Sequence, residues 1–140
     1  MSTRALIHFQ DKNENGEQET FCSCYNHYDG YPTGLGANLA GFLTGTKLVN
    51  GISMREKCRV FNGMGCLAAS FVKDFKAGPG GLYMAPAGCS DRWEEYVYTI
   101  YGDFEQEPCL RCETYTGQVL FDGPASEFDG AVAEAKQNEE

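Results

Sequence analysis

Runs of strands joined by tight turns, in place of strands that alternate with helices, are the feature that most restricts how this chain can fold. Residues Ala5 to Phe9 form an apolar strand pattern, and residues 20–28 form a second pattern that is rich in aromatic side chains. The polar segment between them ends in Asn15-Gly16, which favours a hairpin turn because both residue types tolerate a positive φ. The first two strands are therefore expected to pair antiparallel.

The remaining elements are two or three helices and four further strands. Helices are predicted at 34–43 with Thr33 as N-cap, at 54–76 with an interruption at 62–65, and after the capping-box sequence 126–129, with Phe128, Val132 and Ala135 facing the core. Strands are predicted at 82–84, 94–101, about 110–115 and 119–121. This order favours an α+β fold: an antiparallel sheet of five to six strands with two to three helices packed on one face. We expect one domain over 1–136 and a frayed tail over 137–140.

The acidic side chains are concentrated in the last third of the chain. The net charge is -9, yet residues 1–90 hold eight basic and seven acidic side chains, whereas residues 91–140 hold three basic and 13 acidic ones. Affinity for nucleic acid comes from Lys and Arg, so generic nucleic-acid binding and binding to anionic membranes are not expected. The basic region 47–76 could meet the acidic region 91–140 of another copy in a homo-oligomer, or the two could neutralise each other within one molecule.

Cysteine usage and the N-terminus indicate a cytoplasmic protein. The N-terminal apolar run is too short for a signal peptide, and no window approaches the ~20 apolar residues of a membrane span. The cysteines number seven, so at least one would be unpaired in a disulfide framework. We expect free thiols in a reducing compartment, most of them serving as small buried residues.

The segment 27–36 (His-Tyr-Asp-Gly-Tyr-Pro-Thr-Gly-Leu-Gly) contains the densest group of chemically active residues. Glycines at a predicted helix start can leave backbone N–H groups open to an anion, and a His and an Asp can orient a ligand or exchange protons. Arg4 could pair with a ligand carboxylate or phosphate. The alternative is a rigid turn in which the Asp accepts hydrogen bonds from its own loop, with Arg4 solvated. The predicted ligand-binding residues are Arg4, His27, Tyr28, Asp29, Tyr31, Thr33, Gly34 and Gly36.

Two stretches carry a resemblance to known proteins. The opening Ser-Thr-Arg-Ala-Leu-Ile of residues 2–7 and the His-Tyr-Asp-Gly-Tyr-Pro of residues 27–32 resemble a family of small uncharacterised proteins from bacteriophages and bacteria. Segments 67–72, 80–83 and 95–98 are similar to it more loosely. The resemblance implies a soluble intracellular protein that a phage could encode. It implies no activity, and the cysteine pairs lie outside its pattern.

The cysteines offer two further hypotheses. A zinc ion could take its ligands from Cys22, Cys24 and His27 together with the Cys-x-x-Cys pair Cys109 and Cys112. Against this, the first pair is Cys-x-Cys on a predicted strand, and the two cysteines of the second pair can point to opposite faces of a strand. Cys66 begins an amphipathic helix, where a thiol pKa is lowered, and His27 with Asp29 would complete a Cys-His-Asp arrangement.

Taken together, these features favour a small non-enzymatic binding or interaction protein without a cofactor. It would hold a small anionic ligand near the 27–36 segment, or act on a protein partner, which would be a host factor for a phage-encoded protein. Residues 91–140 could also mimic an acidic nucleic-acid surface. Two alternatives stay open: a Cys-dependent hydrolase or transferase that uses Cys66, His27 and Asp29, and a zinc-stabilised structural protein.

Overall fold

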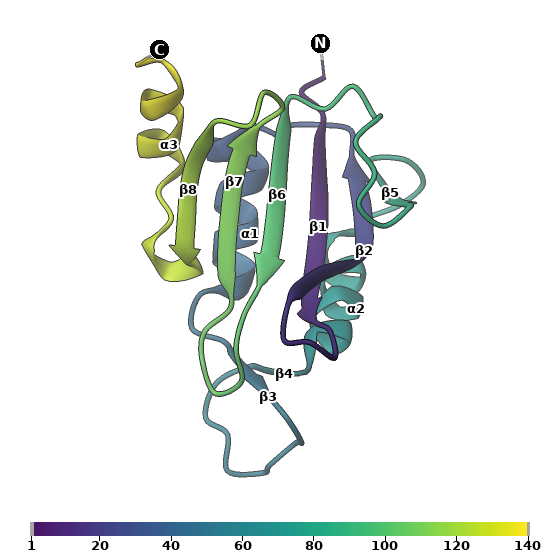
Figure 1. The fold of residues 1–140 in the computed structure, drawn as a ribbon, viewed down its shortest axis with the longest axis vertical. Coiled ribbons are helices and arrows are strands. Elements are labelled where there is room, and N and C mark those ends of the chain that lie inside the picture. Colours follow the sequence, from purple (N-terminus) through teal and green to yellow (C-terminus); the bar gives the residue numbers. More distant parts are fainter. Residues whose placement is uncertain (1, 140) are drawn as a thin grey trace.

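The α+β architecture is confirmed by a computed structural model, which describes residues 2–139 (Figure 1). A six-stranded sheet has the order β5-β2-β1-β6-β7-β8. Its strands are β1 (Ala5–Lys12), β2 (Gln18–Asn26), β5 (Leu82–Ala85), β6 (Tyr96–Tyr101), β7 (Cys109–Thr114) and β8 (Val119–Pro124). The helices are α1 (Ala37–Leu43), which continues a π-helical turn over Pro32–Gly36, then α2 (Met64–Phe75) and α3 (Gly130–Gln137). Among them, no helix is long and apolar enough to cross a membrane.

The sheet is mixed, because its two central strands run parallel. β1 pairs antiparallel with β2 through the predicted hairpin, but parallel with β6, with Ile7 opposite Tyr98. The other neighbouring pairs of this sheet are antiparallel. After β2 the chain forms the helical layer and then β5, which pairs with β2. It next crosses to the other side of β1, where β6 runs parallel to β1. The expectation of a purely antiparallel sheet misses this one pairing.

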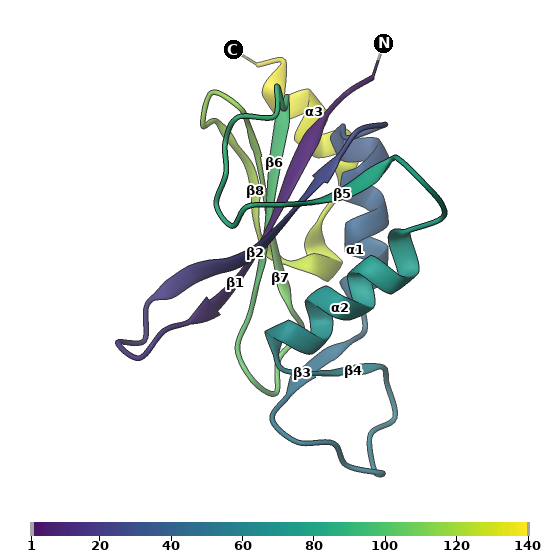
Figure 2. The same cartoon turned by 90° about the vertical axis from the view of Figure 1, so that its right-hand side faces the viewer.

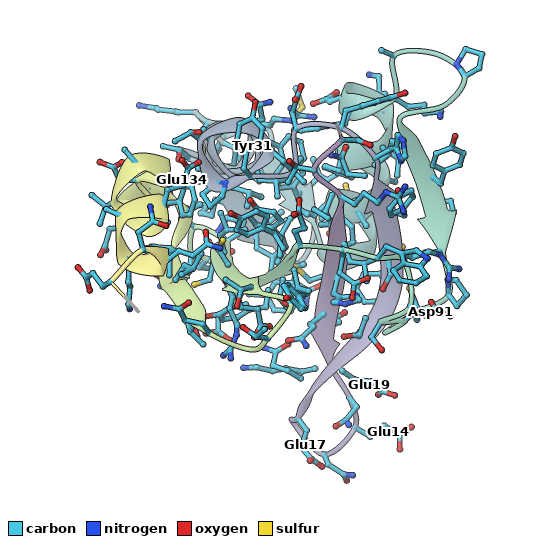
Figure 3. The ribbon with its side chains drawn as sticks, turned by 90° about the horizontal axis from the view of Figure 1, so that it is seen from above. Glu14, Glu17, Glu19, Tyr31, Asp91 and Glu134 are labelled. Atoms are coloured by element: carbon cyan, nitrogen blue, oxygen red, sulfur yellow. The ribbon has the colours of Figure 1, made fainter. Side chains whose placement is uncertain are left out.

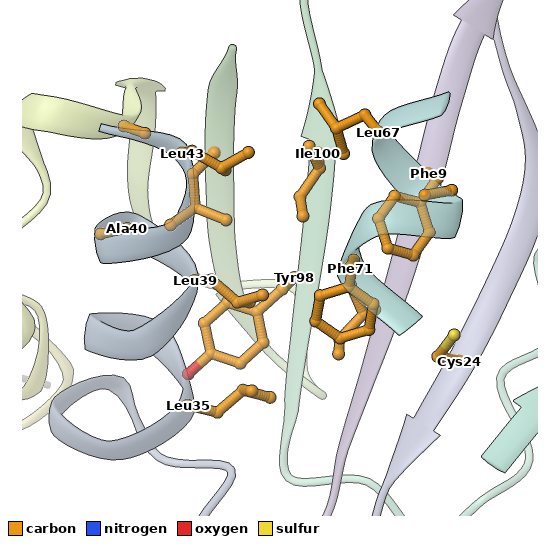
Figure 4. Close-up of a cluster of buried hydrophobic side chains, with 14 of the residues drawn as sticks. Phe9, Cys24, Leu35, Leu39, Ala40, Leu43, Leu67, Phe71, Tyr98 and Ile100 are labelled. Carbon is orange, nitrogen blue, oxygen red and sulfur yellow. The ribbon is translucent and has the colours of Figure 1, made fainter. Parts of the chain in front are cut away.

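The core lies between one face of the sheet and helices α1 and α2 (Figures 2 and 4). Alternate residues of each strand point to this face, as the period of two requires. Phe9 of β1 meets Phe71 of α2 with ring centroids 5.4 Å apart. The largest fully buried side chains of this core are Tyr98, Phe9, Phe61, Phe71, Ile7, Leu39, Leu43, Met64, Leu67, Ile100 and Leu110, whereas Leu6 is buried on the other face of the sheet. The apolar stripe predicted for 65–76 therefore packs in the core.

Residues 54–62 are not helical, which corrects the expected start of the second helix. The segment holds β4 (Val60–Asn62), which pairs parallel with β3 (Lys47–Val49) in a separate two-stranded sheet. Met54 is fully exposed, so this stretch has no apolar face that a helix could bury. α2 begins only after Gly63, whose φ of 89° ends the preceding strand.

The helix starts also differ from the expected capping pattern. Thr33 is not an N-cap, because the first helical turn begins at Pro32 and its N-cap, Tyr31, makes no side-chain capping bond. At the C-terminus the side chain of Asp129 accepts hydrogen bonds from the N–H groups of Ala131 and Val132, so Asp129 caps α3 in place of Ser126. The sequence 125–127 forms a short 3-10 turn instead.

The buried side of α3 is shifted by one residue from the predicted one. Ala133 is buried, whereas Val132 is 63% exposed and Ala135 is exposed. Phe128 is partly buried and packs edge to face against Phe121. The frayed tail expected from residue 137 does not begin there, because Gln137 is the last residue of α3. Its side chain accepts a hydrogen bond from the Tyr96 hydroxyl at 2.7 Å. Glu140 lies outside the described residues.

Candidate functional site

The backbone of the 27–36 segment packs closely against neighbouring parts of the fold. A Cβ at Gly30 would lie 2.8 Å from that of Ala5, and one at Gly36 would lie 2.8 Å from the Phe128 ring. The carbonyl oxygen of Gly30 accepts a hydrogen bond from the buried Tyr98 hydroxyl at 2.7 Å. These glycines therefore let the segment press against the sheet and against the residues that lead into α3.

The amides predicted to bind an anion are already satisfied within the turn. The N–H of Gly34 donates to the Tyr31 carbonyl at 2.9 Å, and that of Gly36 points to the same oxygen at 3.4 Å. The N–H of Leu35 donates to the Asp29 carbonyl at 2.8 Å. A short turn that uses its own carbonyls in this way offers no free N–H groups to a ligand, so the anion site expected at Gly34 and Gly36 does not form.

The other polar residues of this segment also have structural partners. The hydroxyl and the N–H of Thr33 both donate to one carboxylate oxygen of Glu134, at 2.7 and 2.8 Å, and thereby tie the turn to α3. Figure 3 shows Glu134 on the same side of the molecule as Tyr31. The Tyr31 hydroxyl points to the Asp29 carboxylate at 3.4 Å, and this negative charge raises the pKa of Tyr31. The alternative of a rigid turn therefore describes residues 29–36 best.

Three of the predicted ligand-binding residues do come together, at the opposite side of the same loop. Arg4, His27 and Tyr28 line one pocket of about 620 Å³. Its remaining lining residues are Tyr25, Pro79, Gly80, Gly81, Tyr83, Met84 and Arg92. The pocket lies where β1 begins, β2 ends and β5 passes as the edge strand of the sheet (Figure 2). Asp29, Tyr31, Thr33, Gly34 and Gly36 are not among its lining residues.

The wall of the pocket is aromatic. The register of the sheet places Tyr25 of β2 opposite Tyr83 of β5, with ring centroids 5.9 Å apart. His27 packs edge to face on Tyr28, with ring centroids 4.6 Å apart. Tyr28 and Tyr83 are 60% and 50% exposed, so part of each side chain is open to solvent. This wall suits a planar group.

His27 is held in place by three contacts. Its Nδ1 lies 2.6 Å from the Tyr25 hydroxyl, its Nε2 lies 3.4 Å from the Ser2 hydroxyl, and its backbone N–H donates to the Gly81 carbonyl at 2.8 Å. Burial raises the pKa of Tyr25, so the phenol keeps its proton and can either donate to Nδ1 or accept from it, depending on the tautomer of the imidazole.

The charge of the pocket is opposite to that of the chain. Its lining contains two guanidinium groups, Arg4 and Arg92, and no carboxylate. Arg92 forms an ion pair with Asp91, which lies outside the lining. Arg4 forms no ion pair with any other residue in the range 2–139. The Lys76 ammonium is not part of the lining: it donates to the carbonyl oxygens of Gly80 and Leu82 and lies 5.4 Å from the Tyr83 ring centroid.

The structure does not gather the cysteines proposed as zinc ligands. Cys24 lies opposite Ile7, Ile7 opposite Tyr98, and Tyr98 opposite Cys112, so three strand spacings of about 4.8 Å separate the two thiols. Two ligands of one zinc ion would both lie about 2.3 Å from it. Cys22 is on the same face as Cys24, whereas Cys109 points to the opposite face of the sheet from Cys112. No metal-binding group of three or more His, Cys, Asp or Glu side chains occurs within residues 2–139.

The Cys-His-Asp arrangement is not assembled either. Cys66 is exposed in the first turn of α2, beside β4 at one end of the molecule. His27 and Asp29 follow the last residue of β2, at the other end of the sheet (Figure 1). Burial raises the pKa of Cys24 and Cys112 to about 12, so these thiols are not nucleophiles. The structure therefore does not bring together Cys66, His27 and Asp29, the three residues of the hydrolase or transferase hypothesis.

The sequence alone misses the half of the pocket that comes from distant segments. Tyr83 and Met84 reach it through the pairing of β5 with β2, and Arg92 reaches it from the loop between β5 and β6. A local signal exists only for Gly80 and Gly81, whose φ of 78° allows the turn that places the Gly81 carbonyl against His27.

Comparisons of the chain with protein-family models, with curated proteins and with solved structures find no match.

Proposed function

We propose that this protein is a non-enzymatic binding protein that holds a small anionic ligand in the pocket formed by Arg4, His27, Arg92 and the surrounding tyrosines. The observation that carries the proposal is the positive charge of the pocket lining. In a chain of net charge -9, this pocket has a cationic lining without a carboxylate, and one of its two guanidinium groups has no ion-pair partner among residues 2–139. A charged group without a partner costs free energy unless water or a ligand compensates it.

The chemistry of the lining defines the ligand class. A guanidinium presents a planar fork of N–H donors that matches carboxylate and phosphate. The aromatic wall of Tyr25, Tyr28 and Tyr83 adds a surface for stacking. The favoured ligand is therefore a small anion that carries a planar or aromatic group.

Calorimetry with three probes tests this proposal. Adenosine monophosphate has both features, inorganic phosphate has only the charge, and adenosine has only the planar group. We expect adenosine monophosphate to bind most tightly. Arg4→Gln should weaken it roughly tenfold to a hundredfold, since a hydrogen bond to a charged group contributes about 1.5–3 kcal/mol.

Arg55→Gln is the matched control, because it removes the same charge from an exposed site outside the pocket. It should leave affinity unchanged. The proposal fails if neither anion binds the wild-type protein at millimolar concentration, or if both variants lose the same affinity.

We also propose that copies of the chain associate through opposite charges, in line with the expectation from regions 47–76 and 91–140. Part of the basic region is used within the molecule, since Lys47 pairs with Glu56 and Glu105, and Arg59 pairs with Asp74. Within region 47–76, the basic side chains without an ion pair among the described residues are Arg55, Lys57, Lys73 and Lys76. The Lys76 ammonium instead donates to the carbonyl oxygens of Gly80 and Leu82. A phage origin and a host protein as partner rest on the sequence resemblance alone and stay predictions.

A further inference from the structure

The most exposed large apolar side chains mark two surfaces. Met54, Trp93, Ile52 and Tyr115 are exposed by 102%, 84%, 77% and 69%, which are the four highest values among large hydrophobic residues of the described chain. Met54 and Ile52 lie in the loop between β3 and β4, whereas Trp93 and Tyr115 lie in loops that flank β6 and β7. Single exposed apolar residues are common, but grouped ones mark contact sites.

The first surface is an aromatic hollow, the tryptophan hollow, with a volume of about 600 Å³. Its lining residues are Ser90, Asp91, Trp93, Glu94 and Tyr115. Asp91 is paired with Arg92, so Glu94 is the carboxylate of its lining without an ion pair among the described residues. The Tyr115 N–H donates to the Glu95 carbonyl at 3.0 Å, which fixes the two loops against each other. A carboxylate beside an exposed indole suits a cationic side chain, because the ring face attracts positive charge.

The second surface, the basic loop, consists of Ile52, Met54, Arg55 and Lys57. Both cations are exposed, and neither forms an ion pair within residues 2–139. The intervening Glu56 is drawn away from them, since its carboxylate pairs with Lys47 at 3.1 Å. The basic loop thus offers two cations, Arg55 and Lys57, and two apolar side chains, Ile52 and Met54. These complement the carboxylate and the aromatic rings of the tryptophan hollow.

The two surfaces lie at opposite ends of the long axis of the molecule. Figures 1 and 2 show the loop between β3 and β4 at one end, and the start of β6 with the turn between β7 and β8 at the other. One molecule cannot bring them together. A contact between them must join two copies through different patches, which is a heterologous contact that produces chains or rings.

We propose that copies of this chain associate head to tail, with the basic loop of one copy seated on the tryptophan hollow of the next. Met54 would pack on the Trp93 indole, and Arg55 or Lys57 would reach Glu94. The occupant is a second copy because its charge and apolar content match the hollow. The inference rests on the proposed self-association and adds the surfaces and the polarity of the contact.

Sedimentation velocity from micromolar to millimolar concentration tests the proposal. We expect a mass that rises with concentration and falls with salt, because the Debye length shrinks from about 10 Å at 0.1 M to about 3 Å at 1 M. Trp93→Gln and Lys57→Glu should each weaken association about tenfold or more, as a hot-spot residue does. The controls Phe21→Gln and Lys73→Glu remove an aromatic ring and reverse the charge of a lysine at exposed sites outside both surfaces, and they should have no such effect.

Mixing the two variants tests the polarity. The Trp93→Gln chain keeps its basic loop, and the Lys57→Glu chain keeps its hollow, so the mixture should form a one-to-one dimer that cannot grow. Trp93 is the single tryptophan of the chain, so its emission in the Lys57→Glu copy should shift to the blue when the Trp93→Gln copy is added. A chain that carries both substitutions should stay monomeric in every mixture.

Each failure has a distinct meaning. A wild-type protein that is monomeric at all concentrations overturns both self-association and this contact. Association that neither Trp93→Gln nor Lys57→Glu weakens overturns the contact alone. If both variants weaken association but their mixture forms no dimer, the contact is not head to tail.

Discussion

The Tyr98 hydroxyl donates a hydrogen bond of 2.7 Å to the Gly30 carbonyl oxygen, and this bond joins the centre of the sheet to the 27–36 segment. Tyr98 is fully buried, and burial raises its pKa well above the ordinary value, so the hydroxyl remains a donor at all pH values where the protein is folded. The bond holds the loop whose first two residues, His27 and Tyr28, line the pocket that also contains Arg4.

Removing that hydroxyl should destabilise the fold. Tyr98→Phe leaves the carbonyl of Gly30 without this donor, and a buried group that loses its partner costs about 1–3 kcal/mol. Urea unfolding should therefore show a lower midpoint. Tyr115→Phe removes a hydroxyl from a 69% exposed ring and should change the free energy of unfolding by no more than about 0.5 kcal/mol. Equal effects of the two variants would contradict a structural role for this bond.

Two glycines of the helical segment 32–43 should respond in opposite directions to alanine. A Cβ at Gly36 would lie 2.8 Å from the Phe128 ring, so Gly36→Ala should cost about 1–3 kcal/mol through overpacking. A Cβ at Gly41 of α1 meets nothing within 4 Å, so Gly41→Ala should stabilise the helix by about 0.5–1 kcal/mol.

A second-site change checks the cause of the Gly36 effect. Phe128→Leu removes the ring atoms nearest to the new methyl group, so the double variant should be more stable than the sum of the single effects predicts, by about 0.5 kcal/mol or more. Strict additivity in thermal or urea unfolding would show that the ring contact is not the reason.

These glycines also show where prediction from sequence stops. Gly34 and Gly36 before a helix fit an anion-binding loop and a close-packed turn equally well, and only contacts with distant residues such as Phe128 decide between the two. The hairpin of β1 and β2 was predictable because Asn15-Gly16 is a local signal. The parallel pairing of β1 with β6 was not predictable, because no local sequence pattern specifies which strands lie side by side. The pocket was half predictable for the same reason: Arg4 precedes one predicted strand and His27 lies near the end of the next, whereas Arg92 belongs to the loop before β6.

His8 should make the stability of the fold depend on pH. Its Nδ1 lies 2.6 Å from the Ser23 hydroxyl, which also accepts a hydrogen bond from the Gly88 N–H, so a neutral imidazole accepts the Ser23 proton. Burial lowers the pKa of His8, although Glu94 and Glu113 oppose part of the shift. The unfolded chain then binds the proton more readily than the folded one, and stability falls as pH drops from about 6.5 towards the lower folded pKa.

A matched variant isolates the contribution of this histidine. His8→Asn keeps an acceptor near the position of Nδ1 but does not titrate. The difference in unfolding free energy between wild type and His8→Asn should be constant above about pH 7, where the wild-type imidazole is neutral in both states. Below that pH the wild type should lose stability relative to the variant. A difference that does not change between neutral and mildly acidic pH would refute the assignment.

The seven cysteines should divide by burial when the native protein is treated with iodoacetamide. Cys58 and Cys66 are exposed and should be alkylated first, whereas Cys24 and Cys112 are fully buried, with pKa values of about 12, and should react only after unfolding in urea. Peptide mass spectrometry identifies the modified positions. Because three strand spacings separate Cys24 from Cys112, a chelator should leave the pattern unchanged. Alkylation of Cys22, Cys24, Cys109 and Cys112 that begins only when a chelator is added would instead indicate a shared metal ion and would contradict the arrangement of β2 and β7 described above.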